Sequence, residues 1–217
     1  MTYKTAPAKF GIAVALSVFF AGYGFTPSFA ADATQPVAAG VDDHTLGSPN
    51  APVKLVEYAA LSCPVCALFD AKVFPQLKQT YIDTGKVHFS FRMFPISAAD
   101  GAAEAIARCL PKDQYFSFAE VLFRKQNEWD PEFGVTDVHG ALVKLARVAG
   151  LGAEQVDRCI QDKSVQQRIN QIAEDGEKRF KIEATPTLVI DGVAQEPGAI
   201  PWPELQRLIE AALKKKH

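Results

Sequence analysis

The sequence predicts an α/β fold in which a long helical segment interrupts a small sheet. Three observations lead to this prediction. Between residues 53 and 92 a strand pattern, a helical pattern and a second strand pattern follow one another, residues 97–180 show helical patterns alone, and strand patterns return at residue 187. We therefore expect a core built from residues 51–96 and 181–213, with an all-helical insertion at 97–180.

The first thirty residues are typical of a secretory signal peptide. Lys4 and Lys9 precede or flank the start of an apolar stretch at 11–20, and small residues end the segment at Ala30. A membrane anchor is the alternative, but the apolar stretch is short for a span. We expect export to the periplasm with cleavage near Ala30, which leaves residues 31–50 as a flexible leader.

The charge of the chain argues against polyanionic partners. Of 23 basic residues the signal peptide removes two, which leaves 21 against 25 acidic residues and a net charge of −4. Nucleic acids and anionic membrane surfaces are usually bound through basic patches, and the one basic run is the lysine triplet at 214–216. We expect neither kind of partner.

Residues 53–92, the first part of the folded region, show patterns typical of a strand, a helix and a second strand. Residues 53–58 form an apolar run with the length of a buried strand. From Pro64 to about residue 84, apolar residues recur every three or four positions, which predicts a helix that Pro75 should kink. Residues 87–92 alternate apolar and polar side chains, which predicts a half-buried strand.

The remaining elements follow from helical periodicity and from stop signals. Five helices are expected in the insertion, at residues 98–110, 114–128, 137–149, 154–161 and 165–180. Residues 187–190 then predict a strand, Asp191-Gly192 a hairpin turn, and residues 203–212 a last helix.

Four cysteines follow the signal peptide, an even number in a compartment where disulfides persist. Cys63 and Cys66 lie together at a predicted helix start, whereas Cys109 and Cys159 each lie near the end of a predicted helix. We therefore expect a structural Cys109–Cys159 disulfide, which would close a loop of about fifty residues and contribute on the order of 4 kcal/mol. Two separate buried thiols are the alternative.

We expect the Cys63/Cys66 pair to have a role in catalysis and not in stability, because a disulfide that closes so short a loop gives little entropic stabilisation. At a helix N-terminus the dipole lowers the pKa of Cys63, and Cys66, one turn into the helix, would act as the resolving thiol. A metal site would need further ligands, but there is no second Cys-x-x-Cys and the histidines do not cluster. We expect a redox-active disulfide that needs no metal or organic cofactor.

Taken together, these motifs resemble the DsbA-like branch of the thioredoxin superfamily. The resemblance covers nearly all of residues 42–213 and rests on Cys63-Pro64-Val65-Cys66, on Thr185-Pro186-Thr187 some 120 residues later, and on the export signal. Short stretches at 46–53, 56–58, 61–64, 91–95 and 107–109 are also close to the family. The resemblance implies a thioredoxin fold with an inserted helical subdomain and a protein dithiol-disulfide oxidoreductase.

Five residues acquire expected roles from this resemblance. Cys63 corresponds to the exposed attacking cysteine, Cys66 to its buried partner and Pro186 to a cis-proline beside the disulfide. Thr185 would present its backbone to an extended substrate segment. Glu57 matches the buried acid that assists proton movement at the buried thiol, although from its place in the strand it could equally be exposed.

One departure from the family concerns the direction of electron flow. Val65 stands where DsbA itself usually has a histidine that helps to stabilise the thiolate, so we expect a less oxidising pair than in DsbA. Thr185 before the cis-proline also resembles isomerase and reductase relatives.

The leading hypothesis is an exported oxidant that introduces disulfides into reduced or unfolded secreted proteins and is reoxidised by a membrane partner like DsbB. A reductase or isomerase that is kept reduced is the second hypothesis, and a chaperone or copper-binding module is the third. Isomerase relatives commonly carry an N-terminal dimerisation module. About twenty residues separate the cleavage site from Pro52, so a monomer is expected.

Overall fold

The computed structural model describes residues 43–216, so the expected signal peptide and residues 31–42 of the expected leader lie outside the described part of the chain. Its centre is a five-stranded sheet with the order β1-β3-β2-β4-β5, in which β2 and β3 are parallel and the other neighbours are antiparallel. The strands are β1 (His44–Leu46), β2 (Val53–Ala59), β3 (Val87–Met93), β4 (Thr187–Ile190) and β5 (Val193–Ala194).

Strand β1 corrects the expectation of a flexible leader up to residue 50. His44 to Leu46 pair with Phe91 to Phe89 at the edge of the sheet. Three residues are too few to show a strand period in the sequence, and the strand exists because β3 offers it unpaired backbone groups.

The helix that begins at Pro64 is interrupted near the expected place. Helix α1 (Pro64–Lys72) ends at Val73, and α2 (Phe74–Leu77) continues into a π-helical turn, Lys78–Ile82. The interruption falls two residues before Pro75, because a proline lacks the N–H that a continuous helix needs and its ring crowds the preceding turn.

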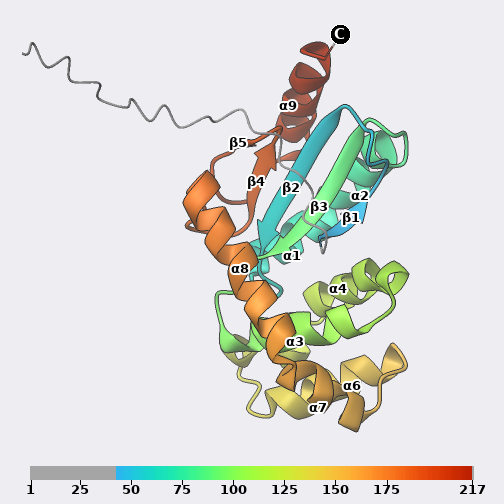
Figure 1. The fold of residues 1–217 in the computed structure, drawn as a ribbon, viewed down its shortest axis with the longest axis vertical. Coiled ribbons are helices and arrows are strands. Elements are labelled where there is room, and N and C mark those ends of the chain that lie inside the picture. Colours follow the sequence, from blue (N-terminus) through green and yellow to red (C-terminus); the bar gives the residue numbers. More distant parts are fainter. Residues whose placement is uncertain (1–42, 217) are drawn as a thin grey trace, which may run out of the picture. The chain divides into compact units, whose positions relative to one another are not determined.

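The insertion is helical, as expected, and Figure 1 shows α3, α4, α6 and α7 gathered at one end of the sheet while α8 runs back along it. The remaining helices are α3 (Ala98–Cys109), α4 (Tyr115–Arg124), α5 (Gln126–Trp129), α6 (Val138–Val148), α7 (Ala153–Gln161), α8 (Lys163–Phe180) and α9 (Trp202–Lys214). The single helix expected at 114–128 is wrong in one respect: it is broken at Lys125, whose backbone is not helical, into α4 and α5. The predicted α/β class with a helical insertion is confirmed.

Two apolar clusters cover the two faces of the sheet. On one face Leu55 and Phe89 pack with Phe69 of α1 and Ile209 of α9, and this cluster continues into the helices of the insertion. On the other face Tyr58 and its neighbours pack against Ile172 of α8. The helical insertion therefore shares its core with the sheet instead of forming a separate one.

Strand β3 was expected to be half-buried, and this expectation is wrong. All seven of its residues are buried, including the polar residues His88, Ser90 and Arg92. Helix α8 packs on the face that the polar positions occupy and reaches Arg92 through Asp175, while the backbone of Gly47 and Ser48 lies at His88. Helix α8 comes so close at Gly176 that a Cβ there would lie 2.6 Å from Cε1 of the Tyr58 ring.

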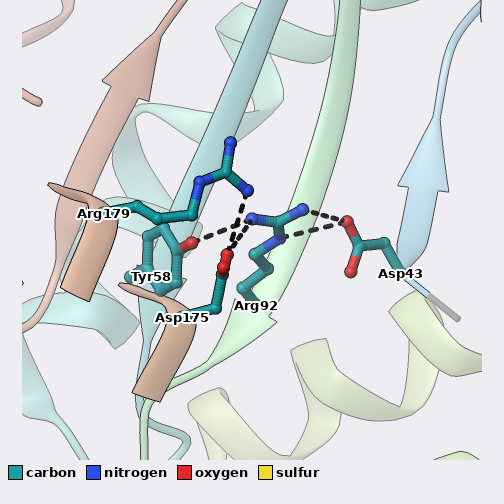
Figure 2. A network of polar contacts seen from close by, with 5 residues as sticks. All are labelled: Asp43, Tyr58, Arg92, Asp175 and Arg179. Atoms are coloured by element: carbon teal, nitrogen blue, oxygen red, sulfur yellow. Dashed lines mark hydrogen bonds and ion pairs between the residues drawn. The ribbon is translucent and has the colours of Figure 1, made fainter. Parts of the chain in front are cut away.

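Arg92 lies at the centre of a polar network on this second face (Figure 2). Its Nε and Nη2 donate hydrogen bonds to Oδ2 of Asp43, at 3.0 and 2.7 Å, and its Nη1 donates to the hydroxyl of Tyr58 at 2.9 Å. Asp175 of α8 approaches Arg92 to 3.6 Å and also pairs with Arg179. The network therefore joins the start of β1, both central strands and α8.

Candidate active site

Cys63 occupies the N-cap position of α1, immediately after β2 and its connecting loop. Its backbone is extended (φ −71°, ψ 118°), and Pro64 follows at the first helical position, where a missing N–H does no harm. The Sγ of Cys63 accepts a hydrogen bond from the backbone N–H of Cys66 at 3.3 Å. The sulfur is thus held at the positive end of the helix dipole, as the sequence predicts.

The loop before β4 brings the distant Thr185-Pro186 pair to the cysteines. The Thr185-Pro186 peptide bond is cis, and the carbonyl oxygen of Thr185 lies 3.5 Å from Sγ of Cys63. Two hydrogen bonds support this loop: Thr187 Oγ1 donates to the carbonyl of Ala184 at 2.7 Å, and the Gly198 N–H donates to the carbonyl of Pro186 at 2.8 Å. Residues 122 positions apart in the chain therefore form one site.

The exposure expected for Cys63 is not what the structure shows. Cys63 is 4% exposed and Cys66 is fully buried, whereas Val65 between them is 38% exposed. The Thr185 loop contributes to this burial, because its carbonyl oxygen lies 3.5 Å from the sulfur of Cys63. Pro64 and Val65 are the exposed residues between the two cysteines.

The two thiols have strongly different acidities. The hydrogen bond with the Cys66 thiol, followed by those from the Thr185 side chain and the Cys66 and Val65 amides, lowers the pKa of Cys63 to about 6, although burial acts against it. Burial, the hydrogen bond to Cys63 and the nearby charge of Glu57 raise the pKa of Cys66. At neutral pH the pair consists of a Cys63 thiolate, which is the nucleophile and good leaving group, and a protonated Cys66.

Glu57 is buried in β2, with 4% of its surface exposed, so the alternative of an exposed strand residue is excluded. It shares the face of β2 that carries Val53 and Leu55, which is the face that α1 covers. Burial raises the pKa of Glu57 well above its ordinary value, and the charges of Asp70 and Cys63 raise it further. Glu57 is therefore a buried acid whose protonated form is favoured more than that of an ordinary glutamate.

Asp100 is a residue of the site that the sequence reasoning missed. One of its carboxylate oxygens accepts a hydrogen bond from the Ser62 N–H at 2.7 Å, and the other accepts one from the Ser62 hydroxyl at 2.9 Å. Asp100 and Ser97 also form the capping box that begins α3. The Ser-x-x-Asp spacing before an apolar helix is the signal that could have located it, although its link to Ser62 has none.

Gln126 was also missed. Its Nε2 donates hydrogen bonds to the carbonyls of Leu61 and Cys63, at 2.7 and 3.0 Å, from a position that is 6% exposed. A single glutamine in a helical pattern carries no sequence signal of this kind. Through Asp100 and Gln126 the insertion holds the loop that carries Cys63, so the helical subdomain positions the nucleophile.

Cys109 at the end of α3 and Cys159 in α7 are joined by a disulfide, with Cα atoms 6.0 Å apart and fifty positions between them in sequence. The bond links two helices of the insertion. Cys63 and Cys66 are both thiols.

Within residues 43–216, no three histidine, cysteine, aspartate or glutamate side chains cluster as a metal site would require. None of the helices in that range has both the length and the apolar character to cross a membrane.

Comparison with known proteins agrees with this geometry. A family model described as thioredoxin matches residues 40–211. Disulfide bond formation protein D of Bacillus subtilis is 29% identical over 175 residues, which cover 79% of this chain and 77% of that protein. The crystal structure of alpha-DsbA1 from Wolbachia pipientis superimposes with a TM-score of 0.76 at 28% identity, over 83% of this chain and 95% of that one. The structure of oxidised BdbD from Bacillus subtilis gives a TM-score of 0.68 at 26% identity, over 79% and 93% of the two chains. This chain belongs to the thioredoxin family and is a DsbA-like thiol-disulfide oxidoreductase, with a thioredoxin-fold sheet into which a helical subdomain is inserted.

Proposed function

We propose that this enzyme is an exported oxidant that introduces disulfides into reduced secreted proteins of the periplasm. The observation that carries the proposal is the difference between the two thiols. Cys63 has a pKa of about 6 at the N-terminus of α1, whereas the pKa of Cys66 is raised in the core. A thiol with a low pKa is stable as a leaving thiolate, which favours transfer of the disulfide to a substrate.

The reaction balances through two exchange steps. A substrate thiolate attacks Sγ of Cys63, the Cys63–Cys66 bond breaks, and its electron pair leaves with Cys66. A second substrate thiolate then attacks the substrate sulfur of the mixed disulfide and expels Cys63 as thiolate. The substrate has lost two electrons and the enzyme has gained them, so the Cys63/Cys66 dithiol must be reoxidised by a membrane partner like DsbB.

The other site residues have supporting roles in this proposal. The cis Thr185-Pro186 bond places a backbone carbonyl 3.5 Å from Sγ of Cys63, where an extended substrate segment can pair with the Thr185 backbone. Glu57 supplies the proton that Cys66 needs when it leaves as thiolate. The Cys109–Cys159 bond is structural, and the enzyme acts as a monomer.

The thiol state of the enzyme in intact cells tests the proposal. After acid quenching and alkylation, we expect most molecules to carry an oxidised Cys63/Cys66 pair. A Cys66→Ser variant should accumulate mixed disulfides with secreted proteins through Cys63, and the matched Cys63→Ser variant should not. A mostly reduced pair in wild-type cells would instead identify a reductase or isomerase, an alternative that Thr185 before the cis-proline favours.

A further inference from the structure

A cleft of about 450 Å³ lies where the end of β3, the last turn of α8 and the loop that leads to Thr185 meet. We call it the acidic cleft, and its lining residues are Phe94, Glu177, Lys181, Ile182 and Glu183. Ile182 and Glu183 precede Thr185 by three and two positions, so their backbone lies within about 11 Å of it. The carbonyl oxygen of Thr185 in turn lies 3.5 Å from Sγ of Cys63. The cleft is therefore close to the nucleophile.

The loop between the cleft and Cys63 presents open backbone groups. Glu183 and Ala184 are exposed and belong to no helix or strand. Within residues 43–216, no hydrogen bond engages the N–H groups of Glu183, Ala184 and Thr185 or the carbonyl of Glu183. An extended segment can pair with such groups, as a peptide adds to an open sheet edge. A substrate that pairs with this loop therefore reaches the acidic cleft about three residues from its reacting cysteine.

The lining combines an apolar floor with a charged rim. Ile182 is 2% exposed and Phe94 is partly buried, and both pack in the apolar cluster on the α8 face of the sheet. Glu177, Lys181 and Glu183 are exposed. A side chain with an apolar stem and a charged end fits this surface, because the stem can cover the floor while the charge stays in water at the rim.

The charges around the cleft favour a cation at that rim. The lining holds two carboxylates and one ammonium group, which leaves one negative charge. The adjacent cations of α8, Lys178 and Arg179, pair with other acids of the helix at 2.9 and 3.3 Å. Among the described residues, neither Glu177 nor Glu183 has an ion-pair partner. Both carboxylates can therefore receive a basic side chain of a substrate.

We propose that the acidic cleft is a specificity subsite that takes a lysine or arginine side chain about three residues from the reacting cysteine of a secreted protein. The inference rests on the proposed exchange reaction at Cys63 and names the substrate sequences that this reaction favours. The covalent steps are unchanged, since the basic side chain forms no bond and only holds the segment beside Cys63. Exposed ion pairs are weak, so the subsite sets a preference among substrates and not an absolute requirement.

The test uses reduced peptides with one cysteine in an uncharged background. One variable residue, lysine, glutamine or glutamate, lies on the N-terminal side of the cysteine in one series and on its C-terminal side in the other. Each peptide is mixed in excess with the oxidised protein, and loss of the Cys63–Cys66 bond is followed by acid quenching and mass spectrometry. Each rate is divided by the rate of the same peptide with hydroxyethyl disulfide, which corrects for the effect of the neighbouring charge on the peptide thiol.

A preference is expected in one series alone, because only one side of the cysteine runs along the loop. There the lysine peptide should react about three- to fivefold faster than the glutamine peptide, as an exposed ion pair allows, and the glutamate peptide should be the slowest. In the other series the three peptides should react alike. The preference should shrink in 1 M salt, because salt screens exposed charges.

Three exposed-site variants locate the preference in the cleft. Glu177→Gln/Glu183→Gln should remove it, whereas Lys181→Gln should increase it, because the competing cation is gone. Glu174→Gln is the matched control, since it removes an exposed carboxylate of α8 that lies outside the lining and should leave the preference unchanged. Circular dichroism checks that all three proteins are folded.

The outcomes separate the inference from the proposal beneath it. Equal rates for the three residues in both series would overturn the inference. Equal preferences in both series would indicate attraction to the net charge of the protein and would also overturn it, as would a preference that persists in Glu177→Gln/Glu183→Gln. If no peptide reduces the Cys63–Cys66 bond faster than it reduces hydroxyethyl disulfide, the proposed exchange reaction itself fails, and the subsite with it.

Discussion

Both faces of the central sheet bury an ionisable side chain, but the charges that surround it differ between the two faces. On the face that α8 covers, Arg92 is surrounded by Asp43, Tyr58 and Asp175, so the positive charge is compensated (Figure 2). On the face that α1 covers, Glu57 is buried near Asp70 and Cys63, which carry charge of the same sign. One face compensates its buried charge with partners, whereas on the other face the surroundings raise the pKa of the buried acid.

The two buried charged residues, Arg92 and Glu57, differ in what they do for the protein. Burial lowers the pKa of Arg92, but the hydrogen bond and charge of Asp43 and the contact with Tyr58 outweigh it, so Arg92 stays charged and its contacts stay in place. The charges that act on Glu57 within the described part of the chain are those of Asp70 and Cys63, both negative, so its carboxyl holds a proton more tightly than an ordinary glutamate does. A compensated buried charge stabilises a fold, whereas an uncompensated acid costs stability and supplies a reactive proton.

The largest expected effect is the loss of the compensated charge. Arg92→Met removes both hydrogen bonds to Asp43, whose side chain is 1% exposed. We expect the free energy of unfolding to fall by about 3 to 5 kcal/mol, as for other broken buried pairs. Urea unfolding measures this, with exchange activity per folded molecule unchanged.

Two controls sharpen this prediction. Arg207→Met breaks the exposed pair with Glu204 and should cost at most about 1 kcal/mol. The double variant Asp43→Asn/Arg92→Met should be more stable than Arg92→Met alone, since it no longer buries the carboxylate. An Arg92→Met protein as stable as the Arg207→Met protein would contradict a structural role for the network.

The opposite sign is expected for Glu57→Gln. Because the pKa of Glu57 is raised, the native state between pH 4.5 and that pKa holds a proton that the unfolded chain has lost, and stability falls as pH rises. Glu57→Gln should therefore stabilise the protein at neutral pH by up to about 3 kcal/mol. The gain should disappear below the ordinary pKa of 4.5, which urea unfolding at neutral and acidic pH would measure.

Glu120→Gln is the matched control for this variant, because Glu120 is an exposed glutamate on α4 that pairs with Arg124. Its substitution should change stability by less than about 0.5 kcal/mol at any pH. A Glu57→Gln protein that is less stable than wild type at neutral pH would mean that Glu57 is ionised and compensated after all.

A smaller effect is expected where α8 packs on the second face. Gly176→Ala would place a Cβ 2.6 Å from the ring of Tyr58, which cannot retreat because its hydroxyl is held by Arg92. We expect a loss of about 1 to 3 kcal/mol in thermal or urea unfolding. Gly101→Ala in α3 meets only the flexible Gln166 and should gain about 0.5 to 1 kcal/mol. Equal stabilities of the two variants would show that α8 does not press on Tyr58.

The smallest effect concerns the redox face. Val65→His would put a hydrogen-bonding or cationic group near the Cys63 thiolate, which favours the reduced form and makes the disulfide more oxidising. Since position 65 is 38% exposed, we expect a rise in potential of about 20 to 30 mV, the equivalent of about 1 kcal/mol. Val65→Thr, with a similar shape and no charge, should leave the potential unchanged. Equal potentials for both variants would show that the residue at position 65 does not affect the reduction potential.

The same two faces show what a sequence can and cannot predict. The contact of Thr185-Pro186 with Cys63 was expected from the resemblance to the DsbA-like family, and it is present. The period of residues 53–58 and the helix from Pro64 are local signals, and the strand and the helix lie where they are expected. Each depends on periodicity or on a proline, which act over a few residues.

The features that the sequence did not predict depend on tertiary contacts. Asp43 and β1 are held by β3, and Arg92 contacts Asp175 of α8, which lies some eighty residues further along the chain. Gln126 reaches the carbonyl of Cys63 only after the insertion has folded against the site. No local pattern marks a residue whose role is set by a partner so distant in sequence.

The most direct test of the oxidising role is the reduction potential of the Cys63/Cys66 couple, measured in equilibrium with glutathione. The Cys63 pKa of about 6 lies between the values of about 3.5 for DsbA and about 7 for thioredoxin. We therefore expect a potential between the about −120 mV of DsbA and the about −180 mV of protein disulfide isomerase. A potential near the about −270 mV of thioredoxin would contradict an oxidant and favour a reductase.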